Sequence, residues 1–233
     1  FLETWRSPVE YAQAFSKMHA GDALGTFVQV EPRQSLTGAN ADLWVNIKPG
    51  TEAFLALAMA RLIVTEGHAS SLSAEETEKL TALLQPYSPE RVATLTDVPS
   101  WRIQSLARDF VGQRPSVAIG GGVATSSREG TASHIAVHLL NYVAGNIGHT
   151  VLFEASGDLD DLHRGQKVAP YSALLSVIET MQRGEVPLLF LAHTNPVFTA
   201  PQASRFSQAL EKVAFIVSFS SFLDETTERA HLV

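Results

Sequence analysis

The sequence has 233 residues, of which 45% are hydrophobic and 18% are charged, and its formal net charge is -7. This composition is typical of a globular α/β protein that can bury a sizeable core. The acidic charge and the lack of a Lys/Arg cluster argue against a nucleic-acid partner, which needs a concentrated basic face. Without cysteine, this chain alone can hold neither a disulfide nor an iron–sulfur cluster. No apolar run approaches the roughly 18 residues of a membrane-spanning helix, so we expect no direct insertion into a membrane.

Both ends of the sequence look interrupted. Phe1 is not an initiator methionine, and the last residues, "TERAHLV", stop inside an apolar segment without a turn or a cap. We therefore expect an internal piece of a longer protein.

The first part of the chain predicts two short strands followed by a buried helix. Residues 25–32 and 41–50 are rich in β-branched and aromatic residues, and each segment ends near a proline. Thr51 is expected to cap a helix over 51–67, which is almost wholly apolar and ends at a glycine.

A polar stretch with several prolines follows over residues 67–100, and within it the pair Ser73 and Glu76 predicts a capping box. We take this stretch as a boundary. The prediction is a first α/β lobe with connecting helices over residues 1–95 and a second, dinucleotide-binding-like lobe over residues 96–233.

In the second lobe, predicted strands alternate with predicted helices, which is typical of an α/β fold with a doubly wound, mostly parallel sheet and helices on both faces. The apolar run "VPLLFLA" is the kind of strand that is buried on both faces. Ligands of such sheets bind beyond the carboxyl ends of the strands. The expected helices are 101–110, 130–148, 173–184 and 202–213, and the expected strands are 115–121, 186–192 and 214–220.

A loop with three adjacent glycines, Gly120, Gly121 and Gly122, lies between a predicted strand and a predicted helix. Backbone N–H groups in this setting can receive an anion, and Thr125 would then supply a hydroxyl. The spacing matches neither G-x-G-x-x-G nor a P-loop, so a tight turn that receives no phosphate is the alternative.

Two clusters could hold a metal ion, and for both we favour the plainer interpretation. His134 and His138 share one helix face without an obvious third ligand, which is typical of surface histidines. The acidic segment 158–163, "DLDDLH", misses the spacing of a calcium loop and reads as a solvated loop.

Polar residues follow the last two predicted strands. Asn195 and Pro196 place an amide at a strand end, although a plain turn explains this pair equally well. After the next strand, Ser221 and Asp224 are candidate helix caps. In the alternative interpretation, Ser220 and Thr226 face a ligand.

Four separated segments occur in the order seen in the molybdopterin oxidoreductase superfamily of the dimethyl sulfoxide reductase type, and the chain resembles the middle of such a subunit. In that family an iron–sulfur segment and the metal-ligand residue precede this region, and a cofactor-binding barrel domain follows it. The segments are "VEPRQSLTGANADLWVNIKPGTEAFLALAMARLIV", "LLNYVAGNIG", "TNPVF" and "FLDETTERAHLV".

The resemblance implies contacts to a molybdopterin guanine dinucleotide through the glycine loop, the loop of Thr194, Asn195 and Pro196, and the segment that carries Ser220 and Thr226. This sequence departs from the family pattern at three positions. The departures are His193 where the family has glycine, Ser220 where it has a guanine-binding aspartate, and His231 where it has another aspartate.

Such departures look similar to the subunits of membrane quinol-oxidising and quinone-reducing complexes that keep the fold and have lost the molybdenum cofactor. The resemblance thus implies an internal region of a respiratory electron-transfer subunit, with a degenerate cofactor site, at the periplasmic face of a bacterial membrane. Its partners would be other segments of the same protein and redox subunits, and the fragment alone is not expected to be active.

The alternatives are a catalytic subunit that binds the dinucleotide and, separately, a free-standing nucleotide-binding domain. The interrupted ends count against the free-standing domain.

Overall fold

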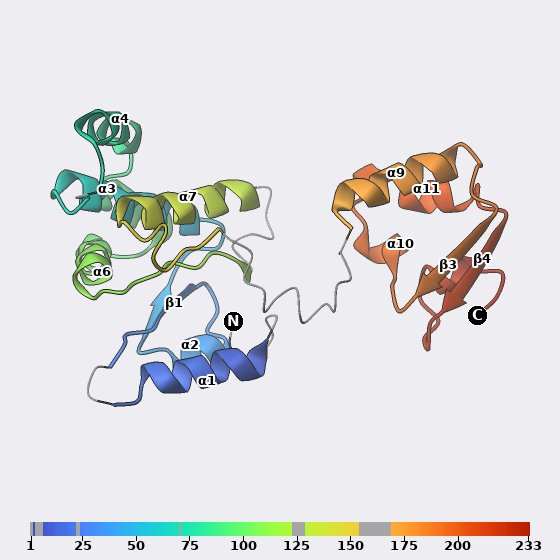
Figure 1. Ribbon diagram of the computed structural model, residues 1–233, viewed down its shortest axis with the longest axis horizontal. Helices are drawn as coiled ribbons and strands as arrows, with labels where there is room; N and C mark the ends of the chain where they lie inside the picture. The colour runs from blue at the N-terminus through green and yellow to red at the C-terminus, as the bar shows by residue number, and fades with distance from the viewer. Residues whose placement is uncertain (1, 3–6, 22–23, 70, 123–128, 154–168) are drawn as a thin grey trace. The chain divides into compact units, whose positions relative to one another are not determined.

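The computed structural model describes residues 2, 7–21, 24–69, 71–122, 129–153 and 169–233 (Figure 1). The chain divides into two compact units, Phe1–Glu154 and Ala155–Val233. Each unit has helices and one pair of short parallel strands, so the predicted α/β class is confirmed. The predicted boundary of the two lobes at residues 95 and 96 stays a prediction about the longer protein.

The first unit is built on a helical core. Helix α3 contacts α4, α5, α6 and α7, and Ala58, Ala60 and Ile63 on it are fully enclosed (Figure 1). Its elements are α1 (Pro8–Met18), β1 (Val28–Glu31), α2 (Leu36–Asn40), β2 (Leu43–Asn46), α3 (Glu52–Thr65), α4 (Ala74–Leu84), α5 (Pro89–Thr96), α6 (Ser100–Gly112) and α7 (Gly130–Val143).

The two predicted strands of this unit form the parallel pair β1–β2, with Val30 opposite Val45. Thr51 stands at the N-cap of α3 as expected, but its hydroxyl donates backward to the Lys48 carbonyl instead of accepting from the helix. The capping box of Ser73 and Glu76 at the start of α4 is confirmed.

The expected strand over residues 115–121 is wrong, because the structure gives this segment no regular secondary structure. The side chain of Asn141 takes the place of a neighbouring strand: its amide nitrogen donates to the Ala118 carbonyl at 2.8 Å, and its oxygen accepts from the Ala118 N–H at 2.9 Å. Asn141 is 1% exposed, so its hydrogen bonds hold residues 115–121 against α7 in the interior of the unit.

The second unit places a two-stranded parallel sheet against helices α9 and α11, with Leu189 opposite Ile216 (Figure 1). A parallel bridge between Val217 and Leu232 lies on the same strand β4. Its elements are α9 (Tyr171–Gln182), β3 (Leu188–Ala192), α10 (Pro196–Thr199), the 3-10 helix η2 (Gln202–Ser204), α11 (Phe206–Leu210), β4 (Phe215–Phe219) and the 3-10 helix η3 (Thr227–Arg229).

Within the second unit by itself, helices cover one face of strand β3, and the expectation of a strand buried on both faces stays a prediction. Leu191 is 9% exposed within the apolar cluster, whereas Phe190 is 60% exposed. The predicted helix 202–213 is also interrupted, because Arg205 adopts a left-handed conformation between η2 and α11.

Candidate functional site

The site residues predicted in the second unit lie on the loops that follow β3 and β4. The two strands end side by side, since Ala192 pairs with Phe219. The first loop leads into the short helix α10, with Asn195 at its N-cap and Pro196 buried at its first position. The second loop leads into η3, with Thr226 at its N-cap. Parallel strands thus bring these polar residues to one sheet edge, as the sequence predicts.

Asn195, Thr226 and Glu225 form a closed set of hydrogen bonds between the two loops. The Thr226 hydroxyl donates to Asn195 Oδ1 at 2.6 Å, and Asn195 Nδ2 donates to Glu225 Oε2 at 2.6 Å. The Thr226 hydroxyl oxygen also accepts from the Val197 N–H at 3.0 Å, which serves an otherwise unpaired donor at the start of α10. The bond from Asn195 is the largest cause of a lowered pKa at Glu225, which stays ionised.

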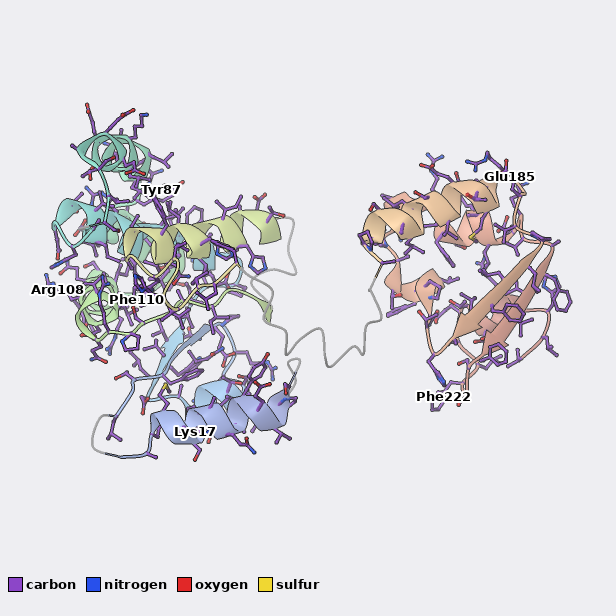
Figure 2. All side chains as sticks on the ribbon, viewed as in Figure 1. Lys17, Tyr87, Arg108, Phe110, Glu185 and Phe222 are labelled. Carbon is purple, nitrogen blue, oxygen red and sulfur yellow. The ribbon has the colours of Figure 1, made fainter. Side chains whose placement is uncertain are left out.

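Asp224 and Ser220 make hydrogen bonds within the second loop. Asp224 Oδ1 accepts from the backbone N–H of Thr227 at 2.7 Å and of Thr226 at 3.1 Å. The bond from the Thr227 N–H is the largest cause of the lowered pKa of Asp224, whose carboxylate accepts from the N-cap and the first residue of η3. The Ser220 hydroxyl donates at 2.8 Å to the carbonyl of Phe222, which is labelled in Figure 2, so it closes a local turn.

His193 is exposed and adopts φ 51°, a left-handed conformation that glycine reaches without steric cost. The backbone at this position thus has the geometry of the glycine that the resemblance led us to expect, with an imidazole added. His231 also has a structural partner: its Nδ1 accepts from the Ile216 N–H at 3.1 Å, and its ring stacks on Phe215 at 5.1 Å.

Thr194 and Pro196 line a mainly apolar hollow between α9, the end of β3 and the segment after α10. Its volume is about 330 Å³, and no charged side chain lines it among the residues that the structure describes. Such a lining offers few groups that could pair with a phosphate or with the edge of a pterin ring. Other lining residues are Leu174, Met181, Leu191 and Phe206.

The glycine loop, with Gly120, Gly121 and Gly122, belongs to the first unit. A Cβ atom at Gly120 would lie 3.1 Å from His134 Nδ1 and 3.5 Å from Val137 Cγ2, so close packing on α7 favours glycine there. Gly121 and Gly122 have φ values of 151° and 63°, a range that side chains rarely adopt. The next part of the loop, including Thr125, lies outside the described residues.

Neither candidate metal cluster gains support. His134 and His138 are exposed on α7, and no group of three or more His, Asp or Glu side chains comes together within the described parts of the chain. The acidic segment 158–163 lies outside those parts. Among the helices that the structure describes, none has the length and apolarity to cross a membrane.

Sequence reasoning missed the hydrogen bonds of two side chains, Glu225 and Thr227. Glu225 receives the Asn195 amide, and the Thr227 hydroxyl lies 3.1 Å from that of Ser218 in the unit's interior. The available signal was the "ET" pair in the last motif. Its partner in the other loop is 30 residues away, so only the strand register brings the two together.

Comparison with known proteins finds similar sequences along nearly the whole chain. The family model of molybdopterin oxidoreductase matches residues 8–233. The menaquinone reductase molybdopterin-binding-like subunit of Nitratidesulfovibrio vulgaris is 32% identical over 247 residues, which cover 100% of this chain and 34% of that protein. The periplasmic nitrate reductase of Desulfovibrio desulfuricans is 24% identical over 88% of this chain and 34% of its own length.

Among solved structures, the acetylene hydratase from Pelobacter acetylenicus shares the fold, with a TM-score of 0.61 at 18% identity over 88% of this chain and 36% of that one. The chain therefore spans about a third of the length of the relatives it matches. The match over residues 8–233 and the 32% identity to the menaquinone reductase subunit place this chain in the molybdopterin oxidoreductase family.

Proposed function

We propose that this chain is an internal region of a molybdopterin-oxidoreductase-like subunit of a respiratory electron-transfer complex, in which the guanine end of the cofactor site is degenerate. The subunit would position redox partners at the periplasmic face of a bacterial membrane instead of carrying molybdenum. The name of the similar Nitratidesulfovibrio subunit, "molybdopterin-binding-like", supports this reading.

The observation that carries the proposal is the closed hydrogen bonding of Asn195, Thr226 and Glu225. Both ends of the Asn195 amide make a hydrogen bond within the protein, at 2.6 Å each, so only its second N–H and the second lone pair of its oxygen are left for a ligand. A guanine edge presents two donors to one acceptor group, which suits a carboxylate and not a single hydroxyl. Ser220 offers only a hydroxyl, and its donated bond goes to the Phe222 carbonyl. The Ser220 hydroxyl therefore does not fit the guanine edge at the position where the family has an aspartate.

The direct test is metal and pterin analysis of the full-length subunit purified within its active complex. We expect molybdenum and tungsten far below one per subunit and no fluorescent pterin after oxidative extraction. Stoichiometric metal with pterin would overturn the proposal.

A second test adds guanine nucleotides to the protein and records thermal unfolding, where a ligand that binds only the folded state raises the melting temperature. We expect no shift, and a rise of several degrees would count against our interpretation of Ser220.

The second candidate function is a catalytic oxidoreductase that binds molybdopterin guanine dinucleotide. It draws support from Gly121 and Gly122, whose positive φ values keep a backbone suited to close approach by a ligand. Relatives named as nitrate reductases also favour it. The metal and pterin analysis separates this candidate from the first.

A further inference from the structure

A histidine side chain takes part in the pairing of strand β4 with the end of the chain, residues 230–232 (Figure 1). The His231 N–H donates to the Ile216 carbonyl at 2.8 Å. Further along, the Ser218 N–H donates to the Leu232 carbonyl at 2.8 Å. Between these two bonds, the Ile216 N–H donates to His231 Nδ1 at 3.1 Å. The imidazole therefore accepts from β4 at a point where a paired strand would offer a backbone carbonyl.

This contact fixes the protonation state of the ring. A backbone N–H can only donate, so Nδ1 must accept with its lone pair. In a neutral imidazole the single proton then lies on Nε2, whereas in an imidazolium both ring nitrogens donate. A proton on Nδ1 would point one donor at another. The bond between Ile216 and His231 therefore exists while the ring is neutral and is lost when acid protonates it.

The groups that face the ring come from three elements. Glu211, which follows α11, and Arg229 of η3 line the same hollow as His231, and their side chains pair at 3.6 Å. From β4, Phe215 stacks on the ring at 5.1 Å and brings no charge. Since a carboxylate and a guanidinium that pair with each other act on the ring with opposite sign, their effects offset. The remaining residues that line this hollow, among those that the structure describes, are the apolar Leu210, Val213 and Ile216.

The segment that His231 holds continues directly from the second loop of the sheet edge. Helix η3 begins after Thr226, whose hydroxyl binds Asn195 in the first loop, and it ends at Arg229, two residues before His231. We propose that His231 is a pH switch: its neutral ring holds residues 230–232 on β4, and protonation releases them and the end of the loop that precedes them. This goes beyond the proposed function and does not depend on whether the subunit holds a cofactor.

The identity of the residue sets the pH range of the switch. Histidine changes its charge between about pH 5 and pH 8, whereas a carboxylate stays ionised down to about pH 4. The aspartate that the resemblance leads us to expect at this position could accept the same N–H, and it would keep that role at mildly acidic pH. The histidine in this chain therefore makes the pairing of β4 sensitive to pH where the aspartate would not.

Hydrogen–deuterium exchange of the full-length subunit tests the proposal. Exchange is followed by mass spectrometry from about pH 8 to about pH 5, the range over which histidine titrates, and each rate is corrected for the intrinsic pH dependence of amide exchange. We expect peptides that cover residues 214–220 and 228–233 to exchange severalfold faster at the acidic end, while peptides of α9 keep their protection. Deuteration of the His231 ring carbon Cε1, recorded on the same samples, reports the charge of the ring. The two transitions should share one midpoint.

Two matched variants identify the histidine responsible. His231→Asn places Oδ1 close to the position of Nδ1, since both atoms are bonded to Cγ, and an amide oxygen accepts at every pH in this range. This variant should abolish the acid-induced exchange. His193→Asn makes the same change in the same unit, at a φ of 51° that asparagine tolerates, and should leave the acid-induced exchange intact.

Three results would overturn the proposal: no acid-induced exchange in the unmodified subunit, its persistence in His231→Asn, or its loss in His193→Asn. The unmodified subunit also gives a test that needs no variant to fold. If the His231 ring titrates at one pH and the β4 peptides lose protection at another, the ring does not control the pairing.

Discussion

His193 holds a left-handed backbone conformation whose steric cost depends on its Cβ atom, since glycine reaches φ 51° freely. That conformation costs other residues roughly 1–2 kcal/mol. Glycine offsets roughly 0.5–1 kcal/mol of this gain, because it loses more conformational freedom on folding than other residues. We therefore expect His193→Gly to raise the free energy of unfolding by up to about 1 kcal/mol in denaturant titrations. His193→Ala keeps the Cβ atom and should bring no gain; equal gains in both variants would contradict a backbone origin.

Thr226 is fully buried and makes hydrogen bonds to two partners, so we expect its substitution to destabilise the sheet edge more than that of its neighbours. Thr226→Val keeps the shape but leaves the Val197 N–H and Asn195 Oδ1 without their partner. An unsatisfied buried polar group costs about 1–3 kcal/mol, so we expect a destabilisation of that order by equilibrium unfolding. Ser220→Ala, which removes an exposed turn hydroxyl, should cost less than half as much. A neutral Thr226→Val would show that the hydrogen bonds between the loops are dispensable.

The residues of this edge could be singled out from the sequence, but their partners could not. Strand periodicity, the Asn-Pro pair and the polar residues after the last predicted strand led to Asn195 and Thr226. That these side chains bind each other depends on the register of β3 and β4, which sets Ala192 beside Phe219. Single-sequence patterns give no such long-range register, because it is fixed by packing of the whole unit.

At the scale of elements, His19 at the C-cap of α1 lies between two hydrogen-bond acceptors, and its protonated form can serve both. His19 Nδ1 lies 2.9 Å from the Phe15 carbonyl, and its Nε2 lies 2.9 Å from Asp42 Oδ2. A neutral imidazole has one N–H and can donate to only one of these acceptors, whereas the imidazolium donates to both. The Asp42 hydrogen bond is the first cause of a raised pKa at His19.

Because the folded pKa of His19 lies above its ordinary value of 6.5, its stabilising contribution is complete below pH 6.5 and is lost as pH rises through the raised pKa. We expect amide exchange of α1 to accelerate across that interval, and the His19 ring signals to titrate above 6.5 by NMR. His19→Gln should remove this pH dependence of α1. A titration midpoint at or below 6.5 would refute the linkage.

Helices α4 and α7 are joined by a carboxylate that also closes the capping box. Glu76 accepts from the Ser73 hydroxyl at 2.6 Å and from the Tyr142 hydroxyl at 2.6 Å, and these bonds lower its pKa from 4.5 to about 2. The resulting stability is present above pH 4.5 and disappears as pH falls towards 2. Tyr142→Phe should raise the pKa of Glu76 part of the way back, which carboxyl-carbon NMR measures. An unchanged pKa would mean that the bond to Tyr142 is not formed in solution.

The contrast between α4 and the segment 115–121 shows where sequence patterns suffice. The capping box is local, since Ser73 and Glu76 are three residues apart and satisfy each other. The apolar run before the glycines has the composition of a strand, but a strand requires a neighbour. Asn141 supplies that pairing from a helix through hydrogen bonds to Ala118, and no local pattern foretells such a contact.

At the scale of the whole molecule, four exposed apolar side chains on one face of the β3–β4 sheet have a consequence for the isolated 233-residue chain; they are Leu188, Phe190, Phe215 and Phe219. Exposed contiguous apolar surface promotes association, and salts that are excluded from protein surfaces strengthen it. We expect the isolated chain to self-associate with rising concentration, and more so in sulfate, as measured by sedimentation velocity. The double variant Phe190→Glu, Phe219→Lys should reduce this association. Its two new charges would stand where the rings now stack at 6.1 Å, close enough to offset each other.

Ile135→Glu is the matched control, because Ile135 is a single apolar side chain, 63% exposed, on α7 of the other unit. Isolated exposed apolar residues are ordinary on protein surfaces, whereas four neighbours on one sheet face are not. The control should therefore leave the association unchanged. If Ile135→Glu dispersed the chain and the double variant did not, this sheet face would not be the surface through which the chain associates. If the double variant alone dispersed it, the isolated chain would associate through this sheet face.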